Sequence, residues 1–220
     1  MAVEMARCAA LLIGKARLAP GIEAVARAAL EAGSVAWWLL KEGLTARQRV
    51  CRMQLLRRNS ARELVRSIEE VGEDPAVAGK ETVPAIEAEC SALGLAPFTR
   101  KGKEIEGQER LGYTARAKKL TDELGYQGAY SIYSGVAHGE LAGVWRLFGE
   151  TGALLPGREP LYGPVANPQA TYAAADGVLK SMMGPVERIV LLFGWAETDR
   201  GAKIGTTIDY INAEMKRLRP

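Results

Sequence analysis

The sequence has few of the residues that several common chemistries require. Its 220 residues include one histidine and three cysteines, and Cys8, Cys51 and Cys90 lie far apart without a CxxC pair. Disulfide frameworks and structural zinc sites need paired or clustered cysteines, and a carboxylate-bridged di-iron bundle usually needs two ExxH motifs. We therefore expect three reduced thiols, no bound metal and a reducing, cytoplasmic environment.

Long apolar runs and phosphate-binding glycine motifs are also missing. The longest later apolar run, residues 189–196, is too short for a bilayer core of about 30 Å. The apolar stretch at residues 8–14 is followed at once by Lys15 and Arg17, which favours a helix over a targeting signal. No GxxxxGK[ST], GxGxxG or GxSxG motif is present. The sequence therefore predicts a soluble protein with no membrane contact and no cofactor.

Helical periodicity dominates what the sequence does contain. Apolar and small residues recur in steps of three and four between Ile22 and Leu40, after Pro20 and before Gly43. Small residues in this stripe allow another helix to approach closely. Similar patterns predict helices over residues 3–18, 45–71, 76–94, 114–124, 127–138, 140–148, 169–197 and 205–218.

Punctuating residues set the expected helix ends. Thr45 and Thr114 are the expected N-caps, and Pro84 is expected to start or break a helix. A kink is expected at residues 184–185, where glycine precedes proline. The polar residues 97–112 are the best loop candidate, and the proline-rich residues 151–168 should be extended, with one hairpin near 151–165 as an alternative.

No stretch of the sequence alternates convincingly between apolar and polar residues, so strands are not expected to build the fold. No linker is long enough to demand a second domain. The sequence therefore predicts an all-α multi-helix bundle in a single helical domain, residues 1–220.

The only histidine marks the one candidate site. Tyr130, Ser134 and His138 are spaced four apart on one predicted helical face, with Tyr133 and Glu140 nearby. Hydroxyl, imidazole and carboxylate groups together can perform acid–base chemistry. The alternative is structural, because a histidine before a glycine at a helix C-terminus is also a good cap.

Two parts of the sequence resemble a known family. Ala28–Leu40 with Gly43–Val50, and later Ser134–Gly139, resemble an uncharacterised group of bacterial helical proteins over about residues 20–70 and 126–148. That group is similar to HEPN-domain proteins, helical bundles of toxin–antitoxin and abortive-infection systems. Many of these are metal-independent RNases that act as dimers. The resemblance implies a HEPN-like bundle, a homodimer, and RNA or a nucleotide as the ligand.

The family mechanism implied by this resemblance pairs the histidine with an arginine shortly before it on an inner helix. The arginine stabilises the phosphate while the histidine acts on the ribose hydroxyl or the leaving group. Here the matching positions hold Ser131, Ile132 and Tyr133, so the histidine carries over and the arginine does not. Arg146, eight residues after His138, is the candidate substitute from the next helix.

The tryptophan-containing helix of the matched segment offers further candidates. Glu31 is placed to face the histidine helix and orient the imidazole, or else is a solvated glutamate. Trp37 and Trp38 point about 100° apart, so at most one should be central core. The other is expected to line a pocket or an oligomer interface. The expected homodimer would use this face or the stripe of small residues.

A basic helix is the second candidate surface. Arg58, Arg62 and Arg66 are four apart, and Arg47 lies three turns before Arg58, which places the four on one predicted face. Like charges at this spacing repel slightly. The ladder could contact phosphates or an acidic protein partner, or it could be a solvated face paired with glutamates further along the helix.

Three functional hypotheses follow from these features. The first is a HEPN-like protein of a defence or toxin–antitoxin system that binds RNA or a nucleotide near His138. The second is a non-enzymatic module whose arginine helix meets a protein partner. The third is an enzyme acting on a small molecule in an apolar bundle pocket that holds Tyr130, Ser134 and His138.

Overall fold

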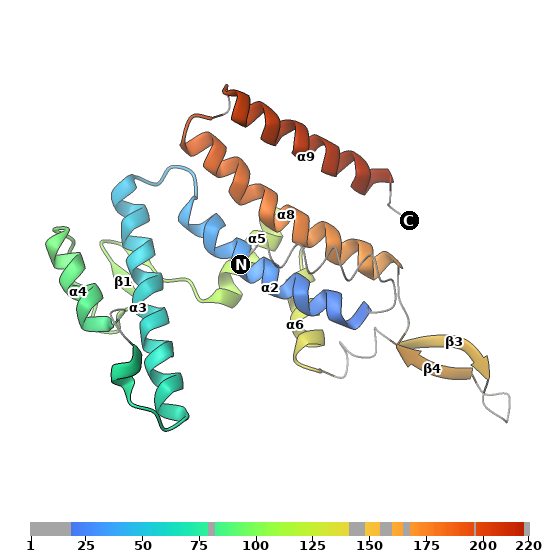
Figure 1. Cartoon of the computed structure of the whole chain (residues 1–220), viewed down its shortest axis with the longest axis horizontal. Coiled ribbons are helices and arrows are strands. Elements are labelled where there is room, and N and C mark those ends of the chain that lie inside the picture. Colours follow the sequence, from blue (N-terminus) through green and yellow to red (C-terminus); the bar gives the residue numbers. More distant parts are fainter. Residues whose placement is uncertain are drawn as a thin grey trace. The chain divides into compact units, whose positions relative to one another are not determined.

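The structure, a computed structural model of the whole chain, describes residues 19–78, 82–140, 148–154, 160–164, 168–195 and 197–217. Most of these residues lie in helices (Figure 1), which confirms the predicted all-α multi-helix bundle. The described chain forms two compact units. The core unit holds the described residues up to Leu40 and from Tyr113 onwards, and the insert unit is Lys41–Gly112. The single domain expected over residues 1–220 stays a prediction.

The core unit is built around one central helix. In chain order its described elements are α2 (Ala19–Leu39), α5 (Tyr113–Glu123), α6 (Ala129–Ala137), β3 (Phe148–Leu154), β4 (Pro160–Pro164), α8 (Pro168–Leu192) and α9 (Asp199–Arg217). The helix α2 packs against α8, α5 and α6, and α9 packs against α8 (Figure 1). The strands β3 and β4 form an antiparallel hairpin.

Close approach of α2 to α8 depends on Gly33. A Cβ added at this glycine would lie 2.4 Å from the carbonyl oxygen of Ser181 and 3.1 Å from its Cβ. The Ser181 side chain is itself fully buried and donates a hydrogen bond to the Val178 carbonyl at 2.7 Å. The expectation that small residues of α2 admit another helix closely is therefore confirmed, and α8 of the same chain is that helix.

Both tryptophans of α2 are buried, so the expectation that at most one lies in the core is wrong. Trp37 is 5% exposed and Trp38 is 2% exposed. Each is covered from a different helix, because the guanidinium of Arg188 on α8 lies 5.2 Å from the Trp37 ring and that of Arg116 on α5 lies 5.8 Å from the Trp38 ring. A homodimer through the tryptophan or small-residue face conflicts with this packing, and the homodimer itself stays a prediction.

Several element ends of the core unit differ from the sequence predictions. The helix α5 begins at Tyr113, so Thr114 lies inside it instead of capping it. The helix α8 continues through Pro185 and ends at Leu192. The helix α9 begins at Asp199, earlier than residue 205, because the Thr198 hydroxyl accepts the Gly201 N–H at 3.2 Å and caps it.

The predictions around β3 and β4 have a mixed outcome. Phe148 lies in β3 and not at the end of a helix, and the hairpin alternative near residues 151–165 is confirmed by the β3–β4 pair. The rest of the predicted helix over 140–148, from residue 141 to 147, and the predicted helix over 3–18 lie outside the described residues.

The insert unit combines two helices with a small hairpin. Its elements are α3 (Ala46–Glu70), the 3-10 turn η1 (Pro75–Ala78), α4 (Val83–Ala92), β1 (Glu104–Ile105) and β2 (Gln108–Glu109). Thr45 and Gln48 form a reciprocal capping box, as expected for an N-cap at this threonine. Pro84 lies in the first turn of α4, where its missing N–H costs nothing.

The hairpin corrects the loop predicted over residues 97–112. The strands β1 and β2 pair antiparallel and are joined by Glu106 and Gly107, both with positive φ (47° and 72°). Two consecutive residues of this kind favour a type I′ turn, whose twist matches that of the flanking strands. A non-glycine residue in the left-handed region needs compensating contacts.

The carboxylate of Glu106 supplies those contacts and ties the hairpin to α3. It accepts the Arg47 Nε–H at 2.7 Å and the Ala96 backbone N–H at 2.9 Å, and the Cys51 thiol lies 3.6 Å away. The Arg47 guanidinium, followed by the Ala96 N–H, lowers the pKa of Glu106 to about 2. Arg47 is therefore committed to this contact and does not continue the predicted arginine ladder.

We expect Gly33→Ala to destabilise the core unit, because its methyl group would meet the α8 backbone. Overpacking of this kind costs about 1–3 kcal/mol, which exceeds the gain of about 0.5–1 kcal/mol from replacing a helical glycine. The melting temperature should fall. The control is Gly205→Ala on α9, where an added Cβ meets nothing within 4 Å. This variant should melt at or above the wild-type temperature, and equal shifts in both variants would contradict the packing argument.

We expect Glu106→Gln to lower the melting temperature at pH 7 and to matter less in acid. A carboxyl whose pKa falls on folding from 4.5 to about 2 stabilises the fold above pH 4.5, and this is lost as the pH falls towards 2. The difference in melting temperature between variant and wild type should become smaller as the pH falls over that range. Glu104→Gln, which removes an exposed carboxylate two residues away, is the control. A gap that stays constant with pH would contradict the assignment.

Candidate functional site

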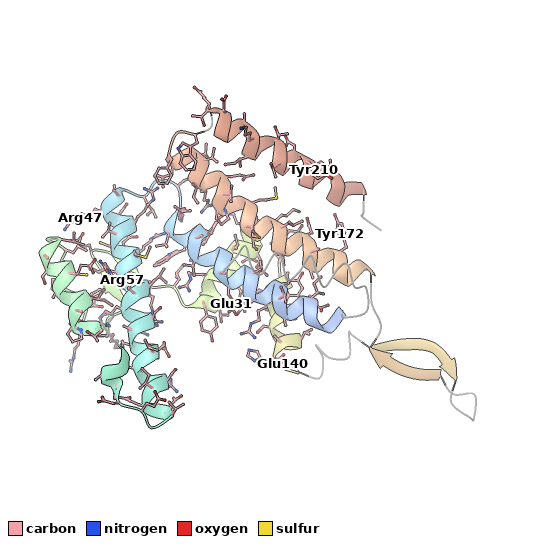
Figure 2. All side chains as sticks on the ribbon, in the orientation of Figure 1. Glu31, Arg47, Arg57, Glu140, Tyr172 and Tyr210 are labelled. Atoms are coloured by element: carbon pink, nitrogen blue, oxygen red, sulfur yellow. The ribbon has the colours of Figure 1, made fainter. Side chains whose placement is uncertain are left out.

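A polar cluster connects α2 with α6 in the core unit. The Tyr130 hydroxyl donates to Oε1 of Glu31 at 2.8 Å, and Arg27 Nε–H donates to the same oxygen at 2.9 Å. The Nη1 of Arg27 lies 2.9 Å from Nε2 of His138. Figure 2 labels Glu31 on α2 and Glu140 at the end of α6, the two helices that carry this cluster.

The helical register explains how these side chains meet. Arg27 and Glu31 are one turn apart on α2, so the carboxylate fixes the guanidinium beside it. His138 is the C-cap of α6, and its backbone N–H donates to the Ser134 carbonyl at 2.9 Å. The structural alternative for His138 is therefore present, and the same residue also contacts Arg27.

The contact with Arg27 fixes the role of one imidazole nitrogen. A guanidinium can only donate hydrogen bonds, so Nε2 of His138 is the acceptor in this contact. His138 itself is exposed, whereas Tyr130 is 2% exposed. Burial, together with the hydrogen bond to Glu31, raises the pKa of Tyr130 even though Thr114 opposes it. The tyrosine therefore stays a donor that holds Glu31 in place.

The structure brings together three of the predicted catalytic residues, Tyr130, Glu31 and His138. Arg27 connects Glu31 to His138. Glu31 was expected to orient the imidazole, and instead it orients Arg27, which contacts His138. Ser134 is half-buried and contributes its carbonyl to the helix end. Its hydroxyl has no hydrogen bond in the described residues. Glu140 folds back over α6. A Cβ added at Gly135 would lie 3.0 Å from the Oε2 of Glu140.

Arg27 is the residue that sequence reasoning missed. It lies 111 positions from His138, so no local motif connects the two. The one available signal was its position a turn before Glu31, a residue already singled out. Arg146, the substitute considered from the sequence, lies outside the described residues.

Tyr133 lies away from this cluster, in a buried environment beside Glu23. Burial first, and the Glu23 carboxyl second, raise the pKa of Tyr133 to about 12. Glu23 is 3% exposed, and its Oε2 has no hydrogen-bond partner among the described residues. Burial raises the pKa of Glu23 despite its own backbone N–H. Tyr133 is therefore a core residue here and not part of the exposed site.

A basic cleft of about 550 Å³ is the second candidate site, and it lies within the insert unit. The predicted residues Arg58, Arg62 and Arg66 all line it, which agrees with their shared helical face. Arg58 is largely buried, pairs with Glu87 at 2.9 Å, and lies 5.0 Å from the Phe98 ring. The remaining lining residues are Asn59, Glu63, Arg100, Lys101, Gly102, Lys103 and Arg110.

The described residues contain neither a candidate membrane span nor a candidate metal cluster. No described helix is long and apolar enough to cross a membrane. No group of three or more His, Cys, Asp or Glu side chains in this part of the chain could hold a metal ion. Comparison of the chain with models of protein families, with curated proteins and with solved structures found no match.

We expect Glu23→Gln to stabilise the protein at neutral pH and to have little effect in acid. A buried carboxyl whose pKa rises on folding destabilises the fold only when it is ionised. The stability of the wild type therefore falls as the pH rises above 4.5, the ordinary pKa of a glutamate. The melting-temperature gain of the variant should be near zero at pH 4 and positive at pH 8. Glu187→Gln, at an exposed position on α8, should show no such trend. A gain that does not depend on pH would contradict the assignment.

Proposed function

We propose that this chain is a HEPN-like helical protein of a defence or toxin–antitoxin system that binds an RNA phosphate at Arg27 and His138. The observation that carries the proposal is the 2.9 Å contact between Arg27 Nη1 and His138 Nε2. The resemblance of the sequence implies an arginine beside the histidine, and α2 supplies one where the histidine helix does not. The system context is taken from that resemblance alone.

The geometry of Arg27 suits it to a phosphate. Glu31 engages the Nε edge, and His138 lies at Nη1, so the guanidinium is held in one orientation before any ligand arrives. Arginine has five N–H donors in a rigid fork that matches phosphate oxygens. Glu31 and His138 occupy two of them. A fixed donor loses less entropy on binding than a mobile one does.

RNA cleavage is a second candidate function, favoured by the acceptor role of Nε2 of His138. This nitrogen would take a proton from a ribose hydroxyl in place of the Arg27 N–H, while the remaining donors of Arg27 hold the phosphate. The guanidinium would then offset charge on the phosphate. Both groups are at hand without a metal ion.

The other two hypotheses have less support from the described residues. A small-molecule enzyme was expected to hold His138 in an apolar pocket, but His138 is exposed and its partner is a guanidinium. A protein-interaction module was expected to be indifferent to His138 and to use the arginine helix. That helix instead contributes to a concave cleft.

Binding of a fluorescein-labelled single-stranded RNA of about 20 nucleotides, followed by anisotropy, tests the proposal. We expect Arg27→Gln and His138→Ala each to weaken binding about tenfold, since hydrogen bonds to charged groups contribute about 1.5–3 kcal/mol. Arg27→Gln should also reduce the salt slope by about one phosphate contact. Gel analysis of the same mixtures reports cleavage, which His138→Ala should abolish.

The control for lost charge is Lys203→Gln, at an exposed position on α9. It should bind RNA within about twofold of the wild type, because nonspecific electrostatics spread over the surface change little with one distant charge. The proposal fails if Arg27→Gln and His138→Ala bind RNA as tightly as Lys203→Gln does while all three melt like the wild type.

A further inference from the structure

The basic cleft of the insert unit concentrates positive charge from three separate segments. The helix α3 supplies three arginines, the segment before β1 supplies three cations, and the residue after β2 supplies one. Together they are Arg58, Arg62, Arg66, Arg100, Lys101, Lys103 and Arg110. One carboxylate, Glu63, lines the same cleft. Segments that are distant in the sequence therefore converge on one concavity.

Most of this charge is uncompensated. Arg58 pairs with Glu87 and Arg66 pairs with Glu70, the latter between two well-exposed side chains. The other five cations have no ion pair in the described part of the chain. Counting Glu63, Glu70 and Glu87 against the seven cations leaves an excess of four positive charges. Such crowding is unfavourable unless an anion occupies the cleft.

One residue that lines the cleft, Arg110, has a polar atom without a partner among the described residues. The Nε of Arg110 is buried and has no hydrogen bond among the described residues. A buried donor of this kind normally finds an acceptor. Arg110 also lines the cleft, so its guanidinium adds to the positive charge there.

Arg58 is held in position by its neighbours. A Cβ at Gly102, whose φ is +62°, would lie 1.7 Å from Arg58 Nη1, so a larger residue there would displace the guanidinium from this position. The Phe98 ring and the Glu87 carboxylate hold it as well. A smaller adjoining pocket of about 390 Å³ shares Arg58 and Arg100 and includes Phe98.

Two other arginines of α3 are paired with carboxylates. Arg47 is paired with Glu106, and Arg57 donates to Glu89 at 2.7 Å. A surface for a long nucleic-acid strand carries its cations along an extended groove. A compact, multiply charged ligand matches a local cleft better. The volume lies within the range of small-molecule sites, about 300–1,000 Å³.

We propose that this cleft binds a polyphosphate chain, either free or as the tail of a nucleotide. Guanidinium and ammonium donors from three sides suit a chain of linked phosphates, each with several acceptor oxygens. A single phosphate would leave most of the cations unused. The site is separate from the Arg27–His138 pair and does not depend on the function proposed for that pair.

Isothermal titration of the full chain with inorganic tripolyphosphate, pyrophosphate and orthophosphate at matched ionic strength tests this proposal. We expect affinity to rise at least tenfold from orthophosphate to tripolyphosphate. The Arg62→Gln/Lys103→Gln double variant, which changes two exposed side chains without ion-pair partners among the described residues, should lose at least tenfold in tripolyphosphate affinity. Lys41→Gln removes an exposed charge of the same unit outside the cleft and should stay within twofold.

A nucleoside triphosphate distinguishes the two sources of the chain. ATP should displace tripolyphosphate. If ATP and tripolyphosphate bind with equal affinity, the phosphates alone are recognised. If ATP binds more tightly than tripolyphosphate, the adjoining pocket also takes part. The proposal is overturned if tripolyphosphate binds no more tightly than orthophosphate, or if the double variant retains full affinity. It is also overturned if the protein binds the RNA used above more tightly than tripolyphosphate and the Arg62→Gln/Lys103→Gln variant loses this RNA binding. Arg27→Gln should leave tripolyphosphate binding unchanged, so the two proposals fail separately.

Discussion

The contact between the backbones of α2 and α8 at Gly33 and Ser181 is the constraint on which the core unit depends. Because the two helices touch without an intervening side chain at this point, α2 cannot rotate about its axis without a clash. Its rotation in turn decides which residues face α6. With Gly33 against α8, Arg27 and Glu31 meet Tyr130 and His138. The polar cluster is thus positioned by a backbone contact that α2 makes with a different helix, α8.

Sequence patterns predicted those parts of the fold that rest on local chemistry. The periodic stripe of α2 and the capping box at Thr45 are both local, and both were predicted. The β1–β2 hairpin was not, because its strands are two residues long and its turn is secured by Arg47, 59 positions from Glu106. The α9 cap at Thr198 was missed for another reason, since its first turn lacks a clear apolar stripe.

In the candidate sites, too, sequence patterns predicted the local features and missed the contacts between distant residues. His138, Tyr130 and Glu31 were singled out by residue type and spacing, and the structure places them in one cluster. Arg27 joins them only through the packing of α2 on α6. In the insert unit, helical spacing placed Arg58, Arg62 and Arg66 on one face. Periodicity could not tell that Arg47 turns to Glu106 or that the segment at residues 100–103 closes a cleft.

The arrangement of the two units has a consequence for the order of folding during synthesis. The insert unit, Lys41–Gly112, is contiguous, so all its contacts are available once residue 112 has left the ribosome. The core unit is not, because α2 is made first and its partner α8 begins only at Pro168. Contacts between distant segments form late and leave apolar surface exposed meanwhile. The buried face of α2, including both tryptophans, is therefore exposed in the nascent chain while the insert unit is synthesised.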